Sequence, residues 1–191
     1  RGTGTPGAAA VPGTRPQPAE RKIVAPRDVN TDEVHEAVRR AIGPLQTTIK
    51  VYAENRDCYA CHHQGVPMLA LATARTRGLP VDNVVFDEAL EHTRTDLESG
   101  LERYKKGRGQ AGGATQAGYA LWTLEAGGHA PDSVTAIVAQ YFQSIDRELG
   151  HWKPLAARKP MEASRFTSTA VSPRGLAAFG AEVPPDARGA R

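Results

Sequence analysis

Apolar residues recur every three or four positions through most of the chain, which is the spacing of one face of an α-helix. Stripes of this kind, with charged residues between the apolar ones, run through 34–52, 84–104 and 131–149. Two further segments, 66–77 and 114–126, are apolar on nearly all sides, as helices in a protein interior are. The pattern therefore predicts an all-α protein in which buried and amphipathic helices alternate.

Three helical segments end alike. They are ALATARTRGLPVD (70–82), ALWTLEAGGHAPD (120–132) and RGLAAFGAEVPPD (174–186). Their closing residues, Asp82, Asp132 and Asp186, lie 50 and 54 positions apart, which suits one helix pair per repeat. The alternative is that the three segments share only common signals for ending and starting a helix, because many helices end in Gly and the next begins at Pro and Asp. An arc of helix pairs leaves an open apolar end, which predicts a partner subunit or further sequence to cover it.

The ends of the chain differ from its middle. Residues 1–30 are rich in Pro, Gly and Ala and lack apolar periodicity, so an extended arm is expected there. Residues 31–183 are expected to form one helical domain, and 184–191 a short tail, since 191 residues with 40% hydrophobic content suffice for one core. The longest apolar run, 66–74, is far shorter than the roughly 20 residues of a membrane-spanning helix. Membrane association is therefore expected only through a partner or a lost anchor.

The net charge changes this picture little. The chain carries a formal charge of +3, but its basic residues are dispersed among acidic ones, and only 6% of residues are aromatic. A basic stripe with interleaved aromatic residues, which nucleic-acid binding favours, is missing from the sequence. We therefore expect protein partners rather than nucleic acid.

Both cysteines of the chain belong to one five-residue pattern, Cys58-Tyr59-Ala60-Cys61-His62. C-x-x-C-H is the pattern for covalent attachment of a c-type haem. Two thiols at this spacing form thioethers with the two vinyl groups of the porphyrin, and the next imidazole is thereby held at the iron. We expect one covalent haem c on Cys58 and Cys61, with His62 as the proximal ligand. Haem attachment suits an exported, periplasmic or extracytoplasmic chain, and a first residue other than Met agrees with a cleaved export signal.

Zinc binding, redox activity and coincidence are the alternatives to haem at this motif. Zinc could be held by the two thiolates, His62 or His63 and one more ligand, but structural zinc sites usually have two separated ligand pairs. A redox dithiol is expected at a helix start within a βαβ unit, which an all-helical chain lacks. Coincidence is the last alternative for so short a pattern. Haem attachment is favoured because it uses every cysteine.

The sixth ligand of the iron is not indicated by any spacing. His63 and Met68 follow the proximal ligand too closely to reach the opposite face of the iron, so we expect them to pack beside the haem. Leu69 is expected to join them, in a dry wall with Val66 and Leu71. The candidates for the distal position are His35, His92, His129, His151 and Met161. His129 is preferred and His92 comes second, and the alternative is an open or water-bound iron.

The segment 57–82, DCYACHHQGVPMLALATARTRGLPVD, resembles a C-x-x-C-H-H-Q-x-x-P segment of known proteins. These are bacterial c-type haem-containing proteins with squalene-cyclase or prenyltransferase-like α/α-toroid repeats. Segments 118–142 and 165–180 are similar to the helix-pair repeats of the same group, so the resemblance covers 34–184. It implies a partial α/α toroid or helix-pair repeat bundle that carries one haem c.

The departures from this family limit what the resemblance implies. The acidic D-x-D-D motif of the cyclases does not occur, and the chain holds fewer helix pairs than a full toroid. Gln143 and Gly150 to Trp152 look like a degenerate form of the structural Q…G-x-W repeat motif of these enzymes. The prenyltransferases bind zinc through Asp, Cys and His, whereas haem explains both cysteines here. The resemblance thus implies the fold without the cyclase chemistry.

Together these observations predict a mono-haem c-type cytochrome that transfers electrons as a subunit of a larger redox complex, with a redox protein as its partner. One alternative is an accessory or scaffold subunit whose haem is structural or sensory. Another is an α/α-toroid enzyme that acts on an isoprenoid or a glycan, although no acid pair for such a reaction can be identified.

Overall fold

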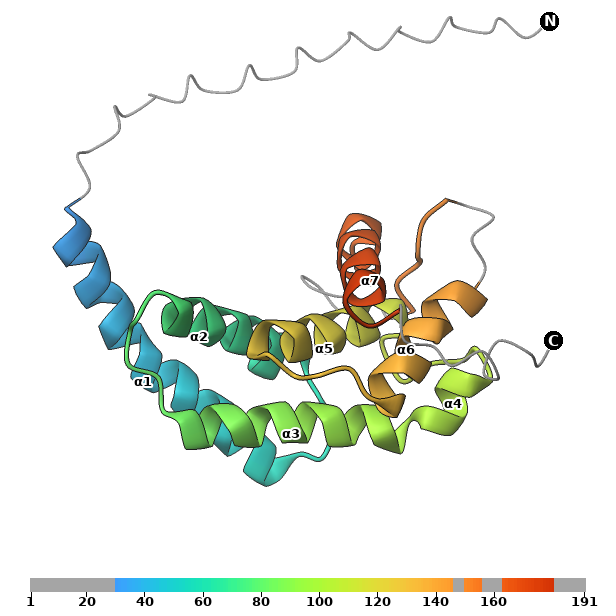
Figure 1. The fold of residues 1–191 in the computed structure, drawn as a ribbon, viewed down its shortest axis with the longest axis horizontal. Helices are drawn as coiled ribbons and strands as arrows, with labels where there is room; N and C mark the ends of the chain where they lie inside the picture. Colours follow the sequence, from blue (N-terminus) through green and yellow to red (C-terminus); the bar gives the residue numbers. More distant parts are fainter. Residues whose placement is uncertain (1–29, 146–149, 156–162, 181–191) are drawn as a thin grey trace, which may run out of the picture.

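A computed structural model describes residues 30–145, 150–155 and 163–180, and this part of the chain is helical without a β-strand (Figure 1). Its elements are α1 (Thr31–Asn55), the π-helical turn η1 (Cys61–Gly65), α2 (Val66–Thr76), α3 (Asn83–Ser99), α4 (Leu101–Lys105), α5 (Ala114–Gly127), α6 (Ser133–Ser144) and α7 (Arg165–Phe179). The all-α prediction is confirmed for these residues. The expected arm and tail fall outside them. None of the described helices is both long and apolar enough to cross a membrane.

One predicted helix is divided in the structure. The stripe at 84–104 predicts a single helix, but α3 ends at Ser99 and α4 begins after Gly100. The side chain of Gln110 explains the break, because its Nε2 donates to the carbonyl oxygen of Asp96 (2.8 Å) and a Cβ at Gly100 would meet its Cδ at 2.5 Å. The Gly100 N–H instead bonds to Leu97 O (3.1 Å). A contact from outside the helix therefore decides where it ends.

The joints between α2 and α3 and between α5 and α6 are built in the same way. Gly78 and Gly128 follow the first helix of each pair with φ angles of 73° and 82°, which favour glycine. Asp82 then accepts from Val84 N (2.9 Å) at the start of α3, and Asp132 accepts from Thr135 N (2.8 Å) at the start of α6. Two of the three predicted joints thus share one geometry, and the third lies mostly outside the described residues.

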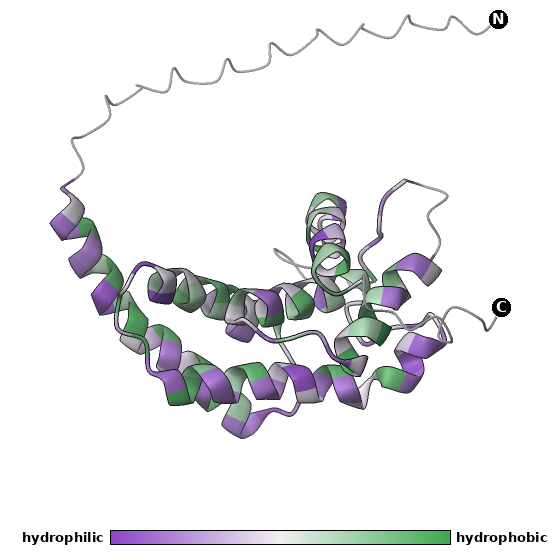
Figure 2. Cartoon of the chain, viewed as in Figure 1, coloured by the Kyte–Doolittle hydropathy of each residue, from purple (hydrophilic) through white to green (hydrophobic). Residues whose placement is uncertain are grey.

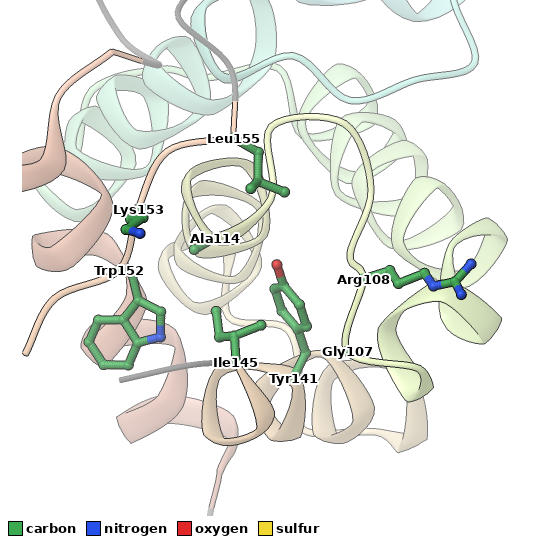
Figure 3. Close-up of a pocket in the computed structure, with 8 residues that line it drawn as sticks. All are labelled: Gly107, Arg108, Ala114, Tyr141, Ile145, Trp152, Lys153 and Leu155. Carbon is green, nitrogen blue, oxygen red and sulfur yellow. The ribbon is translucent and has the colours of Figure 1, made fainter. Parts of the chain in front are cut away.

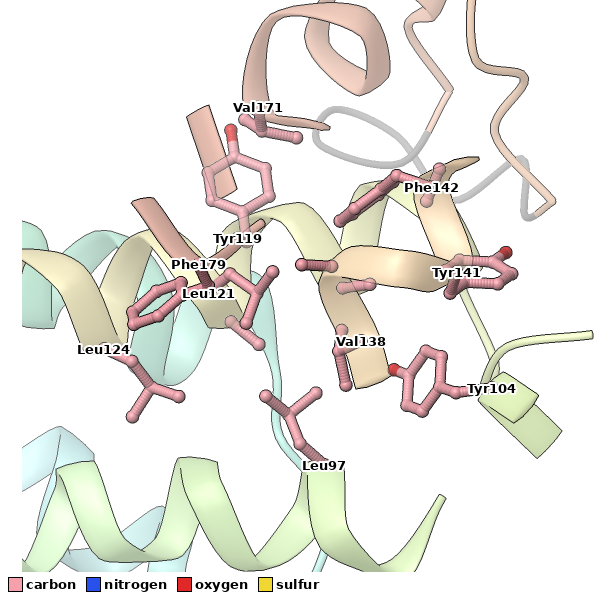
Figure 4. Close-up of a cluster of buried hydrophobic side chains, with 14 of the residues drawn as sticks. Leu97, Tyr104, Tyr119, Leu121, Leu124, Val138, Tyr141, Phe142, Val171 and Phe179 are labelled. Atoms are coloured by element: carbon pink, nitrogen blue, oxygen red, sulfur yellow. The ribbon is translucent and has the colours of Figure 1, made fainter. Parts of the chain in front are cut away.

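The helix α5 is the central element of the fold, since it packs on α2, α3, α6 and α7 (Figure 1). Its neighbours meet it in a main cluster of buried side chains from Tyr59, Cys61 and the helices α3 to α7, part of which is drawn in Figure 4. The labelled members are Leu97, Tyr104, Tyr119, Leu121, Leu124, Val138, Tyr141, Phe142, Val171 and Phe179. By contrast, hydrophilic and hydrophobic residues alternate along α1 and α3 (Figure 2), as the amphipathic stripes predict.

A second cluster of buried side chains lies between α1, α2 and α3. It contains Ile42, Ile49, Met68, Leu71, Ala72, Ala74, Phe86 and Ala89. The sequence predicts α2 to be buried on nearly all sides, but Val66, Ala70 and Thr73 are exposed. The helix α2 therefore has one open side, which begins next to the Cys58–His62 motif.

The approach of α5 to α7 depends on a glycine and can be tested. A Cβ on Gly118 would stand 2.5 Å from Cγ2 of Val171. We expect Gly118→Ala to lower the free energy of unfolding by about 1–3 kcal/mol, because the added methyl group overpacks the interface. Urea unfolding followed by circular dichroism measures this loss. With Val171→Ala in the same chain, the combined loss should be smaller than the sum of the two single losses, and additive losses would contradict this packing.

Candidate functional site

The Cys58–His62 motif lies on the link between α1 and α2, and its two cysteines occupy different environments. Arg56 to Ala60 are irregular, and Cys61 opens the turn η1. Neither cysteine forms a disulfide; Cys58 is exposed, whereas Cys61 is 1% exposed. Cys61 belongs to the main cluster. One thiol is therefore open to solvent, and the other is enclosed beside α5.

A group of rings surrounds the exposed part of the motif. His62 and His63 are exposed, and their ring centroids lie 4.2 Å apart. The ring of Tyr52, in the last turns of α1, stacks on His63 with a centroid distance of 5.0 Å. Its hydroxyl oxygen lies 3.5 Å from Sγ of Cys58. Burial and the neighbouring Cys58 raise the pKa of Tyr52 to about 12, so this phenol stays neutral at physiological pH.

Tyr52 is a site residue that sequence reasoning missed. In the sequence it is one member of the apolar stripe of the first helix. No motif spacing distinguishes it, because its place beside Cys58 and His63 depends on how α1 packs against the motif.

Tyr59, between the two cysteines, attaches the motif to α5. Its side chain is 4% exposed, and its hydroxyl group lies 2.9 Å from Oγ1 of Thr123. Thr123 in turn donates to the carbonyl oxygen of Tyr119 (2.8 Å), so the phenol of Tyr59 is the donor to Thr123. Burial raises the pKa of Tyr59, and the neighbouring Cys61 raises it further. The phenol therefore remains protonated, as this hydrogen bond requires.

Gln64 and His92 connect the motif to α3. Gln64 is fully buried, and its Oε1 accepts a hydrogen bond from the backbone N–H of Ala60 (3.1 Å). Its Nε2 donates to Nδ1 of His92 (2.8 Å), and Nε2 of His92 donates to the carbonyl oxygen of Arg56 (2.7 Å). Because a carbonyl oxygen only accepts, the proton of the neutral His92 ring is on Nε2. The chain of bonds therefore contacts the link at Arg56 and at Ala60.

A buried carboxylate lies one turn further along α3. Asp96 is 5% exposed and accepts from Nε2 of Gln110 (3.3 Å) and Nε2 of Gln116 (3.2 Å). Burial raises the pKa of Asp96, although a hydrogen bond from the backbone N–H of Tyr59 and those two amides partly offset this effect. Asp96 thus gives the middle of the motif a polar contact with α3.

The apolar residues predicted to line a haem divide between the interior and the surface. Met68 and Leu71 are buried in the second cluster. Leu69 packs against the main cluster and is half-buried, while Val66 is 44% exposed. Of the expected wall, only Val66 and Leu69 therefore remain accessible beside the exposed His62.

The two preferred candidates for the distal position differ in their hydrogen bonding. Both ring nitrogens of His92 are hydrogen-bonded within the link, so coordination by His92 would require one of these bonds to break. His129 lies at the joint of α5 and α6, where its buried Nε2 has no hydrogen bond and is 3.5 Å from Oδ2 of Asp132. Of the two, His129 is thus the candidate with a ring nitrogen that forms no hydrogen bond, although this nitrogen is buried beside Asp132.

The remaining distal candidates are scattered over the chain. His35 is exposed on α1, His151 is half-buried beyond α6, and Met161 lies outside the described residues. The proximal candidate, His62, has its ring contact with the adjacent His63. This ring contact of His62 is with its neighbour in the chain and not with His35 or His151.

The zinc alternative gains no support from the side-chain arrangement. Within the described residues, no three or more His, Cys, Asp or Glu side chains are grouped to hold a metal ion. A cavity of about 290 Å³ lies elsewhere, around the start of α5 and Tyr141 of α6 (Figure 3). Its lining comprises Gly107, Arg108, Ala114, Tyr141, Ile145, Trp152, Lys153 and Leu155. The motif is separate from this cavity.

Comparisons with protein-family models, with curated proteins and with solved structures returned no match. The family resemblance therefore stays a prediction from the sequence. Their donor set fits a covalently attached haem: two thiols outside any disulfide, Cys58 and Cys61, precede the exposed imidazole of His62. Exposed apolar surface at Val66 adjoins it. The burial of Cys61 restricts the fit, as does the burial of Met68 and Leu71 in the second cluster.

The packing of the motif on α5 can be tested through Gly65. A Cβ at this position would collide with the hydroxyl oxygen of Tyr59. We expect Gly65→Ala to cost about 1–3 kcal/mol in the free energy of unfolding and to make the buried Cys61 thiol react faster with a thiol reagent. Urea unfolding and thiol labelling of the haem-free chain measure the two effects.

Tyr59→Phe is the matched background for this test, because it removes the colliding oxygen while Thr123 keeps its bond to Tyr119. Gly65→Ala should cost less in the chain that also carries Tyr59→Phe than in the unaltered one. An equal cost in both backgrounds would show that the Tyr59 hydroxyl does not set this packing.

Proposed function

We propose that this chain is a mono-haem c-type cytochrome domain that transfers electrons, as an exported subunit of a larger redox assembly. The observation that carries the proposal is the motif itself. The only two cysteines of the chain form no disulfide and stand in C-x-x-C-H spacing with an exposed imidazole behind them. Cys58 and Cys61 would attach the haem, and His62 would be its proximal ligand.

A haem supplies reversible one-electron chemistry at its iron, and the polypeptide supplies attachment, orientation and a controlled environment. Tyr59 and Gln64 hold the backbone of the motif against α5 and α3. His63 stacks on Tyr52 and lies against the His62 ring at a tilt of 48°, which restricts the orientation of the His62 ring. Val66 and Leu69 offer apolar surface that excludes water beside it, and dryness around a haem shifts its reduction potential.

The enclosed position of Cys61 constrains the order of events. A thiol that is 1% exposed in the main cluster cannot reach a vinyl group from solvent. The thioether at Cys61 therefore has to form before η1 packs against α5, or this contact has to open. Cys58 is exposed and carries no such restriction.

The attachment is tested by exporting the chain in cells that assemble c-type cytochromes. We expect the purified protein to show a c-type pyridine haemochrome and to keep its pigment in acidified acetone. Denaturing mass spectrometry should give a haem-bearing polypeptide. Replacing both cysteines, Cys58→Ala with Cys61→Ala, should abolish covalent haem. His62→Ala should keep the pigment but alter its axial-ligand spectrum. A bare polypeptide from the unaltered chain would overturn the proposal.

A second candidate function is a structural or sensory haem with an open coordination position. It is favoured by the engagement of both ring nitrogens of His92 and by the contact of His62 with His63. Such a subunit would bind a small diatomic ligand rather than pass electrons.

Carbon monoxide distinguishes the two candidates. For an electron carrier with His129 as the sixth ligand, we expect the reduced chain to stay six-coordinate and not to bind carbon monoxide. His129→Ala should then create binding, whereas the exposed His35→Ala should not. Absorption spectra of the reduced proteins measure this. Binding by the unaltered chain would favour the sensory candidate.

A further inference from the structure

Residues 56–60, the link that carries Cys58, form no helix, yet the backbone at both ends of this link is hydrogen-bonded. The carbonyl oxygen of Ala60 accepts from Gln64 N (2.8 Å) and Gly65 N (3.2 Å), which closes the π-helical turn. The N–H of the same Ala60 donates to the side chain of Gln64 (3.1 Å). Gln64 therefore bonds to both backbone polar groups of Ala60, and its side chain caps the Ala60 N–H as the Glu or Gln of a capping box caps the N-cap N–H.

His92 completes this arrangement from a different helix. It accepts from the amide of Gln64 and donates to Arg56 O, so its ring bridges the beginning of the link and the turn that ends it. The segment between these two contacts contains Cys58 and Tyr59. Gln64 is fully buried, so loss of the His92 ring would leave the Nε2 group of Gln64 without a hydrogen bond. Loss of Gln64 would likewise leave Nδ1 of His92 without its donor. The two side chains therefore act as one unit.

We propose that Gln64 and His92 are positioning residues that hold the backbone of the Cys58–Cys61 link, and thereby keep Cys58 and His62 at the surface while Cys61 is enclosed. The positioning role is argued from the hydrogen bonds, whereas its effect on a haem rests on the proposed function. It gives His92 a role in shaping the link from α3. It also explains why a glutamine follows the two histidines, since a side chain with one donor and one acceptor is needed there.

Gln64→Leu and His92→Leu test the link in the haem-free chain. Each removes polar atoms while keeping a side chain of similar bulk. Hydrogen exchange should become about tenfold faster at the amides of Tyr59 and Ala60, because the bonds that protect the link are lost. His92→Gln offers one acceptor and one donor and should restore most of the protection. Gly118→Ala, which perturbs α5 and α7 away from these bonds, is the control for a general loss of stability.

In the haem-loaded protein, the midpoint potentials of the two Leu variants should shift, because the backbone that carries Cys58 and His62 is held less firmly. Gly118→Ala should leave the potential unchanged. Unaltered exchange at Ala60, or equal changes in the Gly118→Ala control, would overturn the inference. If the unaltered chain carries no haem, the proposed function fails, and the exchange data still decide whether Gln64 and His92 hold the link.

Discussion

The packing of residues 59–65 against α5 is the contact on which the rest of the candidate site depends. Tyr59 and Cys61 lie inside the main cluster, and Gly65 has room for no more than a hydrogen atom beside the Tyr59 hydroxyl. The bond from this hydroxyl to Thr123 anchors the segment and satisfies a buried phenol group that would otherwise be unpaired in an apolar interior. Because these residues are fixed, Cys58 and the two histidines are left on the outer side. The division between a buried and an exposed thiol follows directly.

The helix α3 also holds the motif in place, through hydrogen bonds. Its apolar residues Phe86, Ala89 and Leu97 belong to the two clusters, while His92 and Asp96, four residues apart, turn polar groups toward the motif. Polar groups in such an interface cost free energy unless every one is paired. Here Gln64 pairs with His92, and Gln110 and Gln116 donate to Asp96, although the buried Oε1 of Gln116 has no hydrogen bond. These bonds fix the position of the link relative to α3. The proposed electron transfer would benefit from such rigidity, since a well-held site changes little between redox states.

The main elements could be predicted because their causes are local. The spacing of apolar residues predicts helices at 34–52, 66–77 and 114–126, and the joints at Asp82 and Asp132 follow from capping chemistry within a few residues. The predictions that were wrong depend on residues far away in the sequence. The break at Gly100 depends on Gln110, and the exposed side of α2 depends on what packs against it. The sequence did not indicate the role of Tyr52 for the same reason, since stacking on His63 requires α1 to pack against the motif.

By itself, the sequence determined the all-helical character of the described chain and the chemistry available at Cys58, Cys61 and His62, because residue type and spacing carry both. Tertiary structure alone decided which thiol is enclosed, which imidazole is exposed and which is hydrogen-bonded on both nitrogens. Gln64 and His92 are 28 positions apart, and Tyr59 and Thr123 are 64 apart. No local pattern encodes such pairs, because they form only when the helices between them have packed.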